Sequence, residues 1–152
     1  MYRKIVSIVV VFVISFCVLI TSDGHAFSIF GQYKSVSAVG DEVRIPVKDI
    51  DDGKAHYFVY KDGETEIKFF VIKSSDGVLR AAFDACDVCF LEKKGYSQDG
   101  EFMICDNCGM KFHSSQINVV EGGCNPAPLY REMIGENLVI KIGDILPGSR
   151  FF

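Results

Sequence analysis

Two Cys-x-x-Cys pairs carry the clearest chemistry in this sequence. The first pair is Cys86 and Cys89, the second is Cys105 and Cys108, and fifteen residues separate them. A gap of two residues lets both sulfurs of a pair turn toward one ion, and Gly109 suits the tight turn that the second pair requires. This spacing is typical of a metal centre held by four thiolates. We therefore expect these four cysteines to be the metal ligands.

The spacing leaves the type of metal centre open. It differs from the cysteine spacings of common ferredoxins, so zinc, a single rubredoxin-like iron and a [2Fe–2S] cluster all remain candidates. Disulfides are the alternative, because cysteines of exported proteins usually oxidise. Cys-x-x-Cys bridges would also fit a periplasmic thiol oxidoreductase, although no βαβ pattern of the thioredoxin type surrounds them.

The N-terminal segment predicts export. Arg3 and Lys4 precede an apolar run of sixteen residues, from Ile5 to Ile20. A stable membrane span needs about 20 apolar residues, and the small residues around His25 form an A-x-A-like cleavage site. We expect residues 1–26 to be a signal peptide, with a retained N-terminal anchor as the alternative, and residues 27–152 to form one Cys-rich β domain. The predicted location is the periplasm or the outer face of the inner membrane.

The net negative charge of the chain argues against nucleic acid as a partner. The 152 residues carry a net charge of −4, and removal of residues 1–26 changes it to −5. An acidic domain without basic runs lacks the electrostatic footprint of a nucleic-acid-binding protein. We therefore expect no nucleic acid, and a membrane association only through the N-terminus.

The elements that must position the cysteines read as short strands separated by Asp-Gly turns. Pro46 inside one of them predicts an edge strand, because proline cannot donate to a sheet ladder. The pattern predicts an all-β fold, a small antiparallel sandwich or barrel. The expected strands are Glu42–Lys48, His56–Tyr60, Thr65–Lys73, Val78–Asp84, Phe102–Cys105, Ile117–Val120, Leu129–Ile134 and Leu138–Ile142.

Several motifs together resemble known iron–sulfur proteins. "DGVLRAAFDACDVC" and "CDNCGMKFH" are similar to the two ligand segments of a Rieske-type domain, except that a Rieske pair holds one cysteine and one histidine. More closely, "RAAFDACDVC", "KGY", "MICDNCG" and "GGCNPAPL" resemble the FtrD-like membrane iron–sulfur family. The resemblance implies a cell-envelope iron–sulfur or metal-binding domain linked to iron uptake.

The Rieske resemblance also implies a covering loop over the centre, here Gly123–Pro128. Pro126 would stiffen this loop through its fixed φ angle. We expect Cys124 to lie beside the centre and tune it without bonding, because four thiolates already complete a tetrahedral site. His113 is a candidate for a hydrogen-bond donor near the centre, and a partly exposed polar residue is the plainer interpretation.

These features favour an exported iron–sulfur electron carrier that serves envelope redox or iron-transport proteins. No pattern indicates an enzyme with a substrate of its own. Folded export of a cluster typically uses a twin-arginine signal, and this chain has Arg3-Lys4 instead. A structural zinc site in a scaffold or interaction module therefore remains the main alternative.

Overall fold

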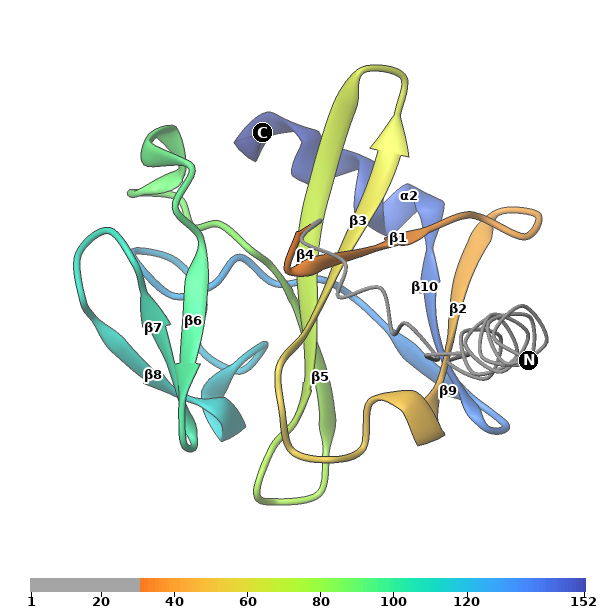
Figure 1. The fold of residues 1–152 in the computed structure, drawn as a ribbon, viewed down its shortest axis with the longest axis horizontal. Helices are drawn as coiled ribbons and strands as arrows, with labels where there is room; N and C mark the ends of the chain where they lie inside the picture. The colour runs from red at the N-terminus through yellow and green to blue at the C-terminus, as the bar shows by residue number, and fades with distance from the viewer. Residues whose placement is uncertain (1–30) are drawn as a thin grey trace, which may run out of the picture. The chain divides into compact units, whose positions relative to one another are not determined.

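A computed structural model describes residues 31–152, which form three β-sheets joined by short helical turns (Figure 1). The signal peptide or anchor predicted for residues 1–26 lies outside the described residues. The strands are β1 (Tyr33–Val36), β2 (Glu42–Pro46), β3 (His56–Asp62), β4 (Thr65–Lys73), β5 (Leu79–Phe83), β6 (Tyr96–Asp99), β7 (Phe102–Cys105), β8 (Lys111–His113), β9 (Glu132–Ile134) and β10 (Asn137–Lys141). The helical elements are the α-helix α2 (Ile142–Ile145) and the 3₁₀ turns η1 (Val47–Asp49), η2 (Phe90–Glu92), η3 (Ser114–Gln116) and η4 (Leu146–Phe151).

The sheets have the strand orders β1-β3-β4-β5, β2-β10-β9 and β6-β7-β8. Every pairing between these strands is antiparallel except that of β1 with β3. Parallel neighbours need a long connection, and here the chain passes through β2 in another sheet before it returns as β3. The all-β prediction is confirmed, and the sheets are open rather than closed into a barrel.

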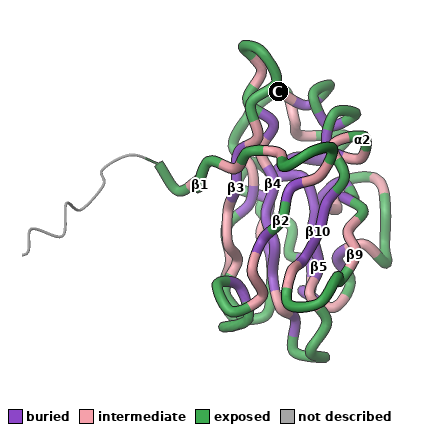
Figure 2. Tube along the Cα trace, turned by 90° about the vertical axis from the view of Figure 1, so that its right-hand side faces the viewer, coloured by how far each residue is buried: buried purple, intermediate pink, exposed green. Residues whose placement is uncertain are grey.

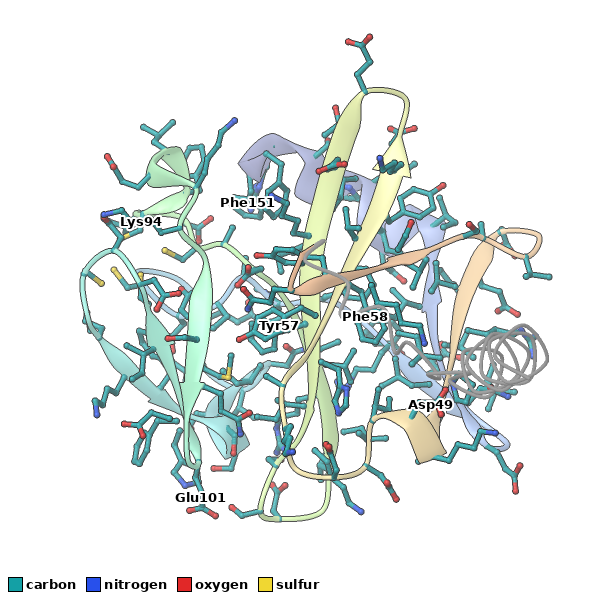
Figure 3. The ribbon with its side chains drawn as sticks, viewed as in Figure 1. Asp49, Tyr57, Phe58, Lys94, Glu101 and Phe151 are labelled. Atoms are coloured by element: carbon teal, nitrogen blue, oxygen red, sulfur yellow. The ribbon has the colours of Figure 1, made fainter. Side chains whose placement is uncertain are left out.

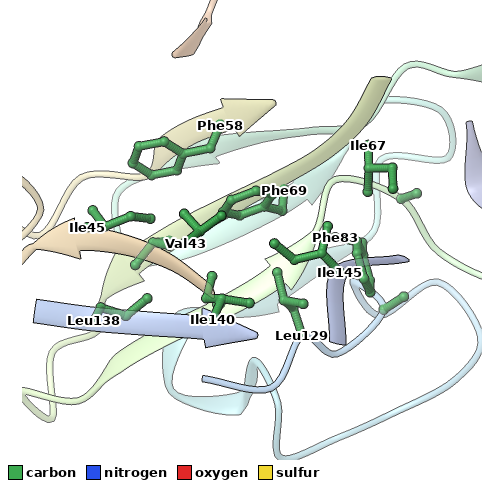
Figure 4. Packing of buried hydrophobic residues seen from close by; sticks show 14 of the residues in the cluster. Val43, Ile45, Phe58, Ile67, Phe69, Phe83, Leu129, Leu138, Ile140 and Ile145 are labelled. Carbon is green, nitrogen blue, oxygen red and sulfur yellow. The ribbon is translucent and has the colours of Figure 1, made fainter. Parts of the chain in front are cut away.

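A large hydrophobic core lies between the four-stranded sheet and the β2-β10-β9 sheet (Figures 2 and 4). From β4, Ile67, Phe69 and Val71 enter this core with no exposed surface. Their alternation with residues of the opposite face is the period-2 pattern of a strand. Strands β2 and β10 supply the facing side chains, which are Val43, Ile45, Leu138 and Ile140.

A second core lies under the other face of the same sheet. Phe70 and Ile72, the alternate residues of β4, pack with Ala82 of β5 against the β6-β7-β8 sheet. Tyr96, Met103 and the buried cysteines Cys86 and Cys105 belong to this second core. The candidate ligands are therefore anchored in packed structure rather than on free loops.

Strands β4 and β7 have the bounds expected from the sequence, and β2 is an edge strand as Pro46 predicted. The prediction of a strand at Ile117–Val120 was wrong, because these residues form a turn. Asn118 adopts a left-handed φ of 63°, and the N–H groups of Val119 and Val120 both donate to the Gln116 carbonyl in a turn. Within residues 31–152, no helix is long and apolar enough to cross a membrane.

Candidate metal centre

The first Cys pair follows the end of β5. Cys86 lies three residues after Phe83 and is 1% exposed, and Cys89 directly precedes the 3₁₀ turn η2. The Cys89 amide N–H donates to Cys86 Sγ over 3.2 Å. This backbone donor orients the sulfur and favours its thiolate form, as expected for a metal-binding knuckle.

The second pair lies at the turn between β7 and β8. Cys105 is the last residue of β7, is 1% exposed, and pairs with Tyr96 of β6. The Gly109 N–H donates to the Cys105 carbonyl over 2.8 Å, and Gly109 has a φ of +73°, a value that suits glycine. The turn leaves Cys108 exposed at the surface.

The third loop, which carries Cys124, is held along the edge of β5. The Phe83 N–H donates to the Ala127 carbonyl over 2.8 Å, and the Ala127 N–H donates to the Ala85 carbonyl over 2.9 Å. These bonds place the loop beside the segment that leads into Cys86. The Tyr96 hydroxyl donates to the Cys124 carbonyl over 2.7 Å and fixes the loop at its cysteine.

The five thiols converge at one end of the β6-β7-β8 sheet. The Sγ atoms of Cys86, Cys89 and Cys124 all lie within 4.8 Å of one another, and so do those of Cys89, Cys105 and Cys108. Cys89 Sγ is 3.9 Å from Cys124 Sγ. Figure 3 shows sulfur atoms gathered near Lys94, at the end of this sheet opposite Glu101.

The thiols differ in how readily they ionise. Burial raises the pKa of Cys86, but hydrogen bonds to its sulfur, including the one from the Cys89 N–H, outweigh this effect and lower the pKa overall. The Met110 N–H lowers the pKa of Cys108. Burial raises the pKa of Cys105 to about 11 and that of Cys124, which also faces other thiols, to about 12. Cys86 and Cys108 therefore ionise more readily than Cys105 and Cys124.

A buried carboxyl group, that of Asp84, holds Tyr96 next to the cysteines by hydrogen bonding. Asp84 Oδ1 accepts a hydrogen bond from the Tyr96 N–H over 2.8 Å, and Oδ2 accepts one from the Tyr33 hydroxyl. Burial raises the pKa of Asp84 to about 6. Sequence reasoning did not single out Asp84; its one signal was a charged residue between an apolar strand and the first cysteine.

The remaining predicted site residues have different positions. Pro126 is buried in the Cys124 loop, directly before the Ala127 anchor. His113 lies at the other end of the sheet, where its ring contacts Ser115 Oγ over 2.8 Å and Glu101 Oε2 over 3.3 Å. The structure therefore brings the five cysteines and the Pro126 loop together, but it does not bring His113 among them.

The donor set fits an iron–sulfur or other thiophilic metal centre. Thiolates are the ligands that iron–sulfur clusters, zinc and monovalent copper favour. A cavity of about 340 Å³ opens beside three of the sulfurs and is also lined by Asp84, Lys68 and Phe151. The four predicted ligands, Cys86, Cys89, Cys105 and Cys108, supply donors of this class.

Comparison with solved structures finds a crystal structure of the quaternary ammonium Rieske monooxygenase CntA in complex with an inhibitor. The match has a TM-score of 0.44 and 16% identity, and it covers 65% of this chain and 30% of that chain. This chain thus spans less than a third of that protein. Among curated proteins, no match was found.

A family model matches residues 50–152, a segment that contains both Cys pairs, the Cys124 loop and the strands that position them. The family is described as membrane iron–sulfur containing protein FtrD-like. The matched segment covers about two-thirds of the sequence, and its thiol donors have the chemistry that the description requires. The chain therefore belongs to the FtrD-like family of membrane iron–sulfur proteins.

Proposed function

We propose that the protein is an exported iron–sulfur electron carrier of the cell envelope, which serves an iron-uptake or metal-handling system. The observation that carries the proposal is the convergence of five thiols from three separate loops. Cys86, Cys89, Cys105 and Cys108 are the proposed ligands, and the centre they hold is a [2Fe–2S] cluster. Such a cluster supplies one-electron transfer.

The scaffold supports this role because it holds buried and exposed ligands together. Cys86 and Cys105 are each 1% exposed, whereas Cys108 lies at the surface. A centre bound in this way is shielded on one side and reachable from the other. Envelope redox or iron-transport proteins would approach from the Cys108 side. The proposed location is the periplasm or the outer face of the inner membrane.

The decisive experiment is to purify the full chain anaerobically from iron-supplied cells and to measure iron, acid-labile sulfide, zinc and the visible spectrum. We expect about two irons and about two sulfides per chain, and an electron paramagnetic resonance signal after reduction. Because thiolates replace both Rieske histidines, the reduction potential should lie below the Rieske range of about −150 to +300 mV.

Two variants test whether the predicted cysteines are the ligands of the cluster. Cys105→Ser should lose iron and sulfide together, whereas His113→Gln should retain both and serves as the control, because His113 contacts Ser115 and Glu101 at the other end of the sheet. A colourless protein that contains zinc and no sulfide would contradict the electron-carrier proposal and would favour a structural zinc site.

A further inference from the structure

The sulfur atoms form two groups that share one member. Cys89 Sγ belongs both to the group with Cys86 and Cys124 and to the group with Cys105 and Cys108. Two thiolates on one tetrahedral ion, with metal–sulfur bonds of about 2.3 Å, lie about 3.8 Å apart. Cys89 Sγ and Cys124 Sγ are 3.9 Å apart. Cys124 therefore lies at the separation of a direct ligand.

We propose that the five thiols form a two-ion site for closed-shell divalent cations of the Zn²⁺ class, with Cys89 Sγ as the bridging thiolate. Cys86, Cys89 and Cys124 hold one ion, and Cys89, Cys105 and Cys108 hold the other. Water completes each coordination shell. This site is distinct from the four-thiolate cluster, and it forms in the protein when no inorganic sulfide is present.

The scaffold places Cys124 as firmly as it places the other donors. The Cys124 carbonyl accepts the Tyr96 hydroxyl over 2.7 Å, and the Asn125 side-chain amide donates to the Gly122 carbonyl over 3.0 Å. Tyr96 is 2% exposed, so its hydroxyl cannot swing away. A donor that the fold positions in advance binds metal without an ordering cost.

Charge balance favours two ions over one. Metal binding converts each bound thiol to a thiolate and releases its proton to solvent. One divalent ion bound by four thiolates leaves a formal charge of −2 at the site with the fifth thiol neutral, whereas two ions bound by all five thiolates leave −1. Because Cys86 and Cys105 are each 1% exposed, residual negative charge among them is costly.

The test uses the full chain, reduced and metal-free, titrated with Cd²⁺ without oxygen and followed by thiolate-to-metal absorbance. We expect saturation at two Cd²⁺ per chain. Cadmium-113 NMR should then show two resonances that are scalar-coupled through the shared sulfur. Saturation at one Cd²⁺ would overturn the proposal, and so would two resonances without coupling.

The variants assign the two positions. Cys124→Ser and Cys108→Ser should each bind one Cd²⁺ and give one uncoupled resonance, and the control His113→Gln, at the other end of the sheet, should retain two. Cys124→Ser with unchanged stoichiometry would contradict the proposal. Circular dichroism of each variant separates loss of a ligand from loss of fold. The test involves no iron or sulfide, so its failure is distinguishable from failure of the electron-carrier function.

Discussion

At the scale of single residues, the cysteine site depends on hydrogen bonds among the buried polar groups of Asp84, Tyr33 and Tyr96. Asp84 is 4% exposed and receives hydrogen bonds from Tyr33 and from the Tyr96 N–H, while the Tyr96 hydroxyl holds the Cys124 loop. A buried carboxyl group needs such partners, because burial without them costs several kcal/mol. Gly95 provides the space for this arrangement. A Cβ atom at this position would collide with the Asp84 carboxyl group.

Gly95→Ala tests that close approach. Gly95 has a φ of +72°, so alanine at this position would be strained by the left-handed backbone conformation. Its Cβ would also collide with the Asp84 carboxyl group, which two hydrogen bonds hold in place. We expect a loss of about 3 kcal/mol in the free energy of unfolding, measured by denaturant titration. Gly100→Ala is the matched control, because Gly100 has a φ of +60° and no atom within 4 Å of its Cβ position. It should lose only about 1 kcal/mol, and equal losses in the two variants would contradict the collision.

At the scale of elements, β4 is the strand that connects the two cores. Its alternate residues face opposite sheets, so that Phe69 and Phe70 are both fully buried. The turn between β4 and β5 is closed by Arg80, whose guanidinium donates to Asp76 Oδ1 and Oδ2 at 2.8 Å each. Arg80 is 7% exposed, so Asp76 is the counter-ion of a largely buried charge.

The Asp76–Arg80 pair predicts a pH dependence. Hydrogen bonds from Arg80 lower the pKa of Asp76 in the folded protein. Ionised Asp76 therefore stabilises the fold fully above its unfolded pKa of about 3.9, and this contribution is lost as the pH falls through the lower folded pKa. We expect Asp76→Asn to be less stable than the parent at pH 7, with the difference shrinking below about pH 4 in thermal unfolding.

Asp62→Asn is the control for this prediction. Asp62 is an exposed residue at the end of β3, in the neighbouring hairpin. Its replacement should leave the stability at pH 7 nearly unchanged. A constant difference between Asp76→Asn and the parent across the acid range would show that the ion pair does not titrate as described.

At the scale of the whole molecule, metal binding joins segments that are far apart in the sequence. The thiols come from the segment after β5, from the β7–β8 turn and from the loop before β9. The core between the β2-β10-β9 sheet and the central sheet contains none of the candidate ligands. The two cores should therefore respond differently to metal removal.

We expect a chelator to accelerate amide hydrogen exchange in β6, β7 and the Cys124 loop, because metal binding stabilises the state in which these segments are assembled. Exchange in β2 and β10 should change little, since Val43 and Leu138 pack without help from the thiols. Hydrogen exchange followed by mass spectrometry, with and without chelator, measures both regions at once. Equal acceleration in both sheets would mean that the two cores unfold as one unit.

Much of this protein can be read directly from its sequence. The period-2 pattern of Thr65–Lys73 predicted β4 with its observed bounds, and the two-residue spacing of the Cys pairs predicted converging sulfurs. Both signals are local, because side-chain alternation and short gaps act within a few residues. Strands β6 and β8 carry no such signal. β6 has the polar sequence YSQD, and its one fully packed residue is Tyr96.

Only the tertiary structure decided which residues meet. β6 is a strand because β7 supplies its hydrogen bonds, and Ile117–Val120 is a turn because Asn118 adopts a left-handed conformation. Cys124 lies sixteen residues after Cys108, yet its loop docks on β5 and brings its sulfur to Cys89. His113, only five residues after Cys108, is carried to the opposite end of the sheet by β8. Spacing in the sequence indicates which residues are candidate ligands, whereas strand pairing and burial determine how close their side-chain atoms come in the folded protein.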